Sequence, residues 1–273
     1  MVVWRRTTGL GWGGLLALML AVSGCSGTGT AASDGRSSDD PLRVVRSAPD
    51  LLVESGSSQT RTAMRMASGG TRLTIQGEGV FDYTSGLGEL RVTLPPDPGA
   101  PERGEPVTEV FAPGELFMKN RGAGVPADKW VRVEVAGVAD GNVVTGGATD
   151  PITAVELLRG VRSADDLGAA SVDGVPVRHY RGVTDIAVAA EAAATARLRE
   201  QLTAAVGGFT STEVPFDAYL DDQGTPRRVR HEFSLAQGLR AVEVTSTVTL
   251  FGFGVTVDVA LPAPEDVYWG AVA

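Results

Sequence analysis

The chain alternates apolar and polar residues over much of its length. From Thr71 to Tyr83, one side of the repeat carries apolar or small residues, namely Leu73, Ile75, Gly77, Gly79, Phe81 and Tyr83. The other side carries Arg72, Thr74, Gln76, Glu78 and Asp82. Shorter runs with the same period lie at Thr62–Ala67 and from Leu90 to Leu94. A period of two residues is typical of a β-strand with one covered face, so these segments are predicted strands.

The same reasoning predicts further strands toward the C-terminus. They are Val107–Ala112, Glu115–Asn120, Lys129–Val135, Val175–Val188, Val214–Leu220, Arg227–Leu235 and Ala241–Leu250. Pro95–Pro106 is predicted to be a loop, and Asp221-Asp222-Gln223-Gly224 a hairpin turn. Gly137–Gly147 is compatible with a loop or with an additional strand pair.

Three segments have the features of helices. The first is a short one within residues 42–58. The second begins at Asp150, a good N-cap, followed by Pro151; Ile152, Val155 and Leu158 form its apolar stripe, and Gly160 is the expected stop. The third is an alanine-rich helix over Ala189–Val206, closed by Gly207-Gly208.

These elements predict an α+β fold with roughly ten antiparallel strands and two or three helices. No repeated strand–helix–strand unit indicates a parallel sheet. An antiparallel sheet of this size tends to curl, and its apolar concave side must be covered. Helices with narrow apolar stripes are suited to cover it.

The N-terminus has the layout of an export signal. Arg5 and Arg6 precede an apolar run from Leu10 to Val22, which ends in Ser23-Gly24-Cys25. The run is shorter than the ~20 apolar residues that span a bilayer, so residues 1–24 are predicted to be a signal peptide. The ending Val22-Ser23-Gly24-Cys25 resembles a lipoprotein signal, which implies cleavage before Cys25 and a diacylglycerol thioether on its sulfur. Cys25 is the only cysteine, and lipidation explains an odd cysteine in an exported protein.

Residues 25–41 are rich in Gly, Ser, Thr and Asp and are predicted to be a flexible tether. Residues 42–273 then form the folded domain. The formal charge of −9 includes Arg5 and Arg6, so the chain without its signal carries −11, which makes nucleic acid a poor partner. Only Lys119 and Lys129 are lysines among 24 basic residues, a bias that suggests a GC-rich, actinobacterial genome. Export in the folded or the unfolded state stays open.

A search for catalytic or metal-binding patterns yields no site. His179 and His231 lie in predicted strands, outside any HExxH arrangement, and no nucleophile-elbow or phosphate-loop motif occurs. His179 beside Tyr180 is interpreted as an ordinary strand residue. Asp217, Asp221 and Asp222 lack the spacing of a calcium loop. We therefore expect a protein that is not an enzyme and has no cofactor or metal.

The order of several segments resembles a known family. They are the cysteine-terminated signal with its tether, the strands around Thr62–Met66 and Leu73–Tyr83, Glu115–Arg132, Asp150-Pro151, Gly174–Gly182 and Val214–Asp221 with Gly224 and Arg227-Arg228. Together they resemble actinobacterial lipoproteins of the LppX/LprG type, which share an architecture with the LolA lipoprotein carrier. The resemblance implies a bent half-barrel closed by helices, and carriage of a lipid in an apolar cavity at the outer face of the cell membrane.

Two hypotheses follow for the covered face. In the first, it lines a ligand cavity, and the candidate lining residues share one parity: Met64, Met66, Leu73, Ile75, Phe81, Leu90 and Val92. The partners are then a lipid-like ligand and the membrane, reached through Cys25, with the protein a monomer. In the second, the same residues form a filled core, and the protein is an envelope scaffold that binds a protein partner. A cavity of several hundred Å³ is typical of ligand sites and would favour the first.

Overall fold

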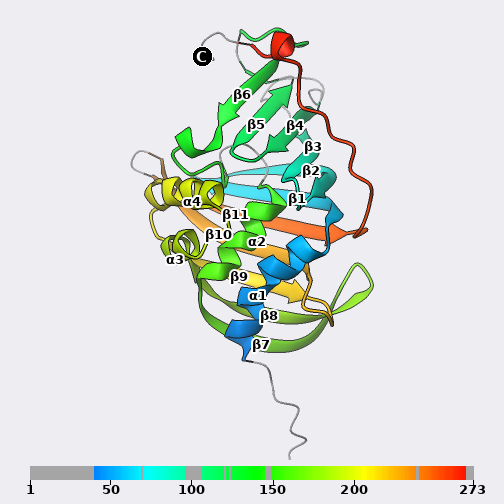
Figure 1. Ribbon diagram of the computed structural model, residues 1–273. Helices are drawn as coiled ribbons and strands as arrows, with labels where there is room; N and C mark the ends of the chain where they lie inside the picture. The colour runs from blue at the N-terminus through cyan, green and yellow to red at the C-terminus, as the bar shows by residue number, and fades with distance from the viewer. Residues whose placement is uncertain are drawn as a thin grey trace, which may run out of the picture. The chain divides into compact units, whose positions relative to one another are not determined.

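The computed structural model describes residues 40–68, 70–95, 106–119, 121–122, 124–144, 149–237 and 240–268. Within these ranges, eleven strands form one antiparallel sheet in the order β6-β5-β4-β3-β2-β1-β11-β10-β9-β8-β7 (Figure 1). The strands of the first half are β1 (Ser57–Ser68), β2 (Thr71–Asp82), β3 (Leu87–Thr93), β4 (Val107–Ala112), β5 (Glu115–Lys119) and β6 (Trp130–Glu134). Those of the second half are β7 (Val161–Val172), β8 (Val175–Asp185), β9 (Glu213–Leu220), β10 (Pro226–Gln237) and β11 (Arg240–Phe251).

The sheet consists of two meanders that meet in its centre. β1 to β6 run outward in sequence order to one edge, and β7 to β11 run inward from the other edge. The last strand, β11, pairs with the first, β1, with Thr62 opposite Val248 and Met64 opposite Ser246. The chain between β6 and β7 must therefore cross from one edge of the sheet to the other.

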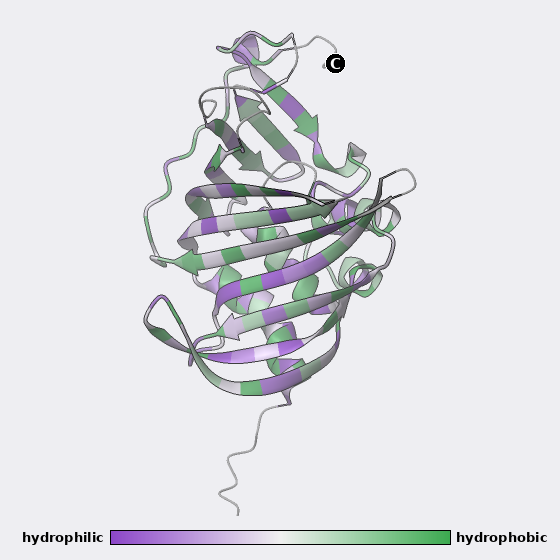
Figure 2. Cartoon of the chain, turned by 180° about the vertical axis from the view of Figure 1, so that it is seen from behind, coloured by the Kyte–Doolittle hydropathy of each residue, from purple (hydrophilic) through white to green (hydrophobic). Residues whose placement is uncertain are grey.

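Four helices lie on one face of the sheet, which we call the inner face, and Figure 1 shows them in front of the strands. They are α1 (Pro41–Glu54), α2 (Pro151–Glu156), α3 (Ile186–Glu191) and α4 (Ala196–Gly208). α1 contacts β7 and β10, and α2, which belongs to the crossing segment, contacts β10 and β11. The opposite, outer face is seen in Figure 2, where polar and apolar positions alternate along the strands.

Side-chain burial follows the predicted alternation. In β1, Ser58, Thr60, Thr62 and Met64 are buried on the inner face, whereas Arg61 on the outer face is exposed. The predicted α+β fold, with a curved half-barrel sheet and helices on its covered side, is confirmed.

Glycines in mid-strand let neighbouring backbones approach closely where the sheet bends. A Cβ on Gly79 of β2 would lie 1.7 Å from the carbonyl oxygen of Glu89 on β3, and one on Gly182 of β8 would lie 1.9 Å from that of Ser163 on β7. Only a residue without a side chain fits such an approach.

Three predictions about elements are corrected. β7 was not predicted, because its burial pattern shows no apolar alternation and its pairing with β8 shifts register twice, at Val161/Ser163 and at Asp166/Gly168. The strand predicted to reach Val188 ends at Asp185, whose carboxylate accepts from the backbone N–H of Ala187 and caps α3. The single alanine-rich helix is two helices, because Thr195 caps α4 separately.

The remaining predictions concern the connections. The described part of Gly137–Gly147 forms turns and no strand pair, while residues 145–147, most of the Pro95–Pro106 loop and residues 1–39 lie outside the described ranges.

After β11, an extended segment brings Val259 and Val267 onto Val110 and Phe117 on the outer face. The described residues from Asp40 to Tyr268 belong to one compact unit.

Candidate functional site

A cavity of about 300 Å³ lies on the inner face between the sheet and two helices. Its walls come from the β2–β3 turn, the β4–β5 turn, the first turn of α2 and the first turns of α4. The lining residues are Phe81, Tyr83, Thr84, Ser85, Gly86, Phe111, Ala112, Pro113, Gly114, Glu115, Val135, Asn142, Asp150, Ile152, Thr153, Thr195, Ala196, Arg197, Leu198 and Gln201. This volume is at the lower end of the range that small-molecule pockets occupy.

Two phenylalanines form the apolar floor of the cavity. The ring centroids of Phe81 on β2 and Phe111 on β4 are 5.3 Å apart, with a tilt of 50° between the rings. Gly88 of β3 lies between them in the sheet, opposite both. A Cβ on Gly88 would lie 2.3 Å from the Phe81 ring, so a glycine on the middle strand is what lets the two rings meet.

A connected set of polar groups forms the wall beneath α2 and α4. The Asp150 carboxylate accepts from the backbone N–H of Thr153 at 2.8 Å and from the Thr153 hydroxyl. Gln201 of α4 donates to the same hydroxyl at 2.9 Å. Burial raises the pKa of Asp150, against the hydrogen bonds from Thr153 that act to lower it. These bonds join α2 to α4 and fix both helices over the cavity.

Tyr83 closes the side of the cavity toward β1. Its hydroxyl lies 2.5 Å from the Ser58 hydroxyl, and both groups are buried. Burial raises the pKa of Tyr83, with the nearby Asp150 acting in the same direction. Tyr83 is therefore a neutral hydrogen-bonding group at neutral pH.

The seven residues predicted to line a cavity all lie on the inner face. The register pairs Met64 with Ile75, Met66 with Leu73, and the glycines Gly79 and Gly77 with Leu90 and Val92. Phe81 lines the cavity described above. Met64, Leu90 and Val92 are buried in the packed core, with exposures of 0–2%. Met66 and Ile75 are half-buried at its border, and Leu73 is 43% exposed.

Most of the cavity lining was missed by the sequence analysis. The missed residues come from two turns and from the first turns of α2 and α4, which are distant in sequence. The apolar stripe of α2 did identify Ile152, and the cap of that helix identified Asp150. No local pattern indicates that the β4–β5 turn and α4 meet at the same place.

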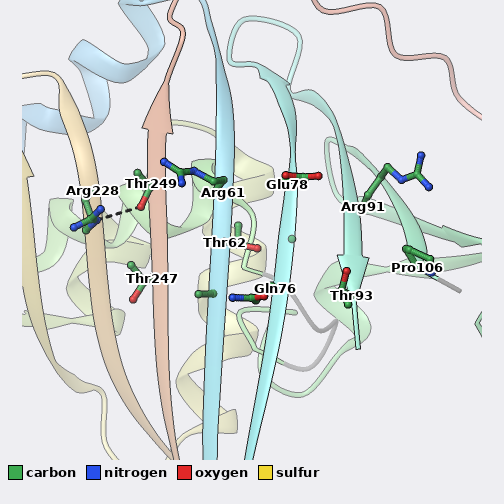
Figure 3. Close-up of a pocket in the computed structure, with 12 residues that line it drawn as sticks. Arg61, Thr62, Gln76, Glu78, Arg91, Thr93, Pro106, Arg228, Thr247 and Thr249 are labelled. Carbon is green, nitrogen blue, oxygen red and sulfur yellow. Dashed lines mark hydrogen bonds between the residues drawn. The ribbon is translucent and has the colours of Figure 1, made fainter. Parts of the chain in front are cut away.

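A larger hollow, of about 730 Å³, lies on the outer face across β10, β11, β1, β2 and β3 (Figure 3). Arg61, Arg91 and Arg228 point along it, among threonines and Glu78. Arg228 donates to the Thr249 hydroxyl at 3.2 Å, and Asp173 of the β7–β8 turn pairs with both Arg61 and Arg228. With this polar lining, the hollow is unsuited to alkyl chains.

His179 of β8 and Asp217 of β9, which were considered as catalytic or metal-binding candidates, belong to a network of hydrogen bonds and ion pairs on the outer face. Asp217 accepts from His179 at 2.7 Å, from Arg181 at 2.8 Å and from Arg230 at 3.2 Å. Burial acts to raise the pKa of Asp217, but the bonds from His179 and Arg181 outweigh it and hold the pKa below its usual range. The predicted hairpin turn at Asp221–Gly224 is confirmed, since Asp221 accepts from the backbone N–H groups of Gln223 and Thr225.

Two buried titratable groups on the inner face lack hydrogen-bond partners within the described ranges. His231 of β10 is 1% exposed, its Nε2 has no partner, and burial lowers its pKa to about 3. Glu109 of β4 is fully buried opposite Leu90, and neither carboxylate oxygen has a partner. Burial raises the pKa of Glu109 to about 8, although the charge of Arg121 acts to lower it.

Glu109 should make stability depend on pH. Between its ordinary pKa of 4.5 and its folded value of about 8, the folded state keeps the proton that the unfolded state loses. The free energy of unfolding therefore falls as pH rises through this window, by at most about 1.4 kcal/mol per pH unit. Glu109→Gln is expected to flatten this slope in urea unfolding measured across the window. Glu78→Gln, at an exposed outer-face position, should keep it; equal slopes in the two variants would contradict this assignment.

Among the described residues, no helix is long and apolar enough to cross a membrane. The same part of the chain contains no group of three or more histidine, cysteine or acidic side chains arranged to hold a metal ion.

No protein-family model matches the sequence, and no curated protein matches it. Among solved structures, the chain is similar to LprF from Mycobacterium bovis, with 12% sequence identity and a TM-score of 0.41, over 82% of this chain and 97% of LprF. It is also similar to the lipoprotein LppX from Mycobacterium tuberculosis, with 14% identity and a TM-score of 0.46, over 80% and 97% of the two chains. A LolA superfamily protein from Nitrosomonas europaea has 12% identity and a TM-score of 0.36, over 78% and 94%. LppX and a LolA superfamily protein are thus among the structures to which the chain is similar, a likeness that assigns no ligand or activity to this chain.

Proposed function

We propose that this chain is a membrane-anchored lipoprotein that binds a lipid or another hydrophobic molecule at the outer face of the cell membrane, without catalysis. The observation that carries the proposal is the inner-face cavity, which combines a phenylalanine floor with a wall of hydrogen-bonded polar side chains. A concave pocket in which polar groups orient a ligand over an apolar surface is a common form of a small-molecule site.

Binding would come from burial of alkyl groups on the phenylalanine floor. Each buried methylene contributes roughly 0.8 kcal/mol before the cost of ordering the chain. α2 and the first turns of α4 would form the gate, because both lie over the cavity and are joined through Thr153 and Gln201. A longer ligand would extend from Phe81 along the inner face toward the other six residues of the predicted lining, which requires the helices to move away from the sheet.

The second candidate function is an envelope scaffold that binds a protein partner. The tight burial of Met64, Leu90 and Val92 favours it, because these positions already form a packed core. The two functions differ in whether the domain takes up an apolar ligand.

The anchor is part of the proposal, since Cys25 lies outside the described residues. The predicted tether of residues 25–41 would let the folded domain that follows it reach ligand at the membrane while two acyl chains hold it there. In the native host, the mature protein should carry the mass of a diacylglycerol group on Cys25. Cys25→Ser should lose that mass and leave the membrane fraction, whereas Ser23→Ala, which keeps a small residue before the cleavage site, should retain both. An unmodified Cys25 in the membrane-bound protein would exclude this anchor.

Filling the cavity should abolish ligand binding at little cost in stability. Ile152 is half-buried on α2 and lines the cavity, so the indole of Ile152→Trp would occupy the volume that an alkyl chain needs. We expect at least a tenfold loss of affinity for a fluorescent acyl probe, from the burial of two or more methylenes that is lost.

The matched control is Val53→Trp on α1, at a position that is 46% exposed and is not part of the cavity lining. It should bind the probe as the parent does. Equal probe affinity in the parent and in Ile152→Trp would show that the cavity is not the binding site, and no binding by the parent would favour the scaffold.

A further inference from the structure

Arg197 crosses the mouth of the cavity from α4 to the β4–β5 turn. Its side chain lies over Gly114: a Cβ on that glycine would be 2.6 Å from Arg197 Nη1 and 3.7 Å from Cζ. Gly114 has a φ of +82°, so the turn requires glycine for its backbone and also leaves room for the guanidinium. Arg197 is itself an exposed side chain, and the absence of a Cβ on Gly114 leaves the space that its guanidinium occupies at the mouth.

Arg197 has no acidic partner in the part of the chain that the structure describes. The two acidic residues that line the same cavity are engaged elsewhere. Glu115 accepts from Arg132, with its Oε1 2.9 Å from Arg132 Nε. Asp150 caps α2 and bonds to Thr153, and burial raises its pKa. Among the described residues, the mouth therefore carries an arginine without an ion-pair partner beside an apolar floor.

We propose that the cavity takes a single-chain amphiphile with an anionic headgroup, a carboxylate or a phosphate, and that Arg197 binds the headgroup. This inference rests on the proposed function and names its ligand class. The guanidinium donates in a fork that suits carboxylate and phosphate oxygens. A cavity of about 300 Å³ is at the lower end of the range of small-molecule pockets, which suits one alkyl chain better than several.

The test compares ligands that differ only in the headgroup. The chain from residue 26 onward contains the whole compact unit, and its affinity would be measured by calorimetry for dodecanoate, dodecanol and a dodecyl lysophosphatidic acid. An anionic ligand should bind about tenfold more tightly than the alcohol, as expected for a charge-assisted hydrogen bond. Whichever anion binds more tightly identifies the source of the headgroup.

Variants then assign the preference to Arg197. Arg197→Gln should remove the difference in affinity between anion and alcohol, and Arg197→Lys should keep part of it. Arg199→Gln is the matched control, because Arg199 is an exposed arginine on the same helix that does not line the cavity; it should behave as the parent.

The outcomes separate this inference from the proposed function. If the parent binds anion and alcohol equally, or if Arg197→Gln and Arg199→Gln keep the same preference for the anion, the role of Arg197 is overturned while lipid binding stands. If the parent binds none of the three ligands, the proposed function fails, and this inference fails with it.

Discussion

The pairing of β1 with β11 is the contact on which the rest of the structure depends. It joins the two meanders into one sheet and places the first and the last strand of the chain side by side at the centre of that sheet. The outermost strands, β6 and β7, are then consecutive in sequence but lie at opposite edges. Because the inner face needs a cover, the connection between them crosses this face and contributes α2.

The cavity is a consequence of this crossing. α2 packs near the centre of the sheet, against β10 and β11, and the turns at the ends of β2 and β4 extend beyond it. The first turns of α4 cover the remaining side, held through Gln201 and Thr153. The apolar floor and the charged mouth therefore come from different elements. The floor comes from strands that the sequence alternation predicts. The mouth comes from a turn and a helix end that are distant in sequence and meet only in the folded protein.

The fold is therefore easier to predict from the sequence than the site is. The alternation of apolar and polar residues identified nearly all strands, because a strand that is buried on one face must alternate in this way. The N-cap Asp150 and the first-turn Pro151 located α2. β7 was missed because it is an edge strand with two register shifts and polar residues on both faces, such as Asp165 and Asp166. The sequence predicted which alternate residues of each strand face the inner side. It could not predict which of these residues border a cavity, because that depends on where the helices leave space above the sheet. Arg197 has no sequence signal at all, because its significance arises from Gly114, more than eighty residues away.

The most direct test of the account is native mass spectrometry of the chain from residue 26 onward, purified from a lipid-containing host, with extraction and identification of any bound lipid. If the cavity binds its ligand as proposed, the parent shows a discrete added mass that extracts as one class of single-chain anionic amphiphile, and Ile152→Trp lacks this mass. A protein mass without ligand, together with no uptake of an acyl probe, would contradict lipid binding and favour the filled scaffold.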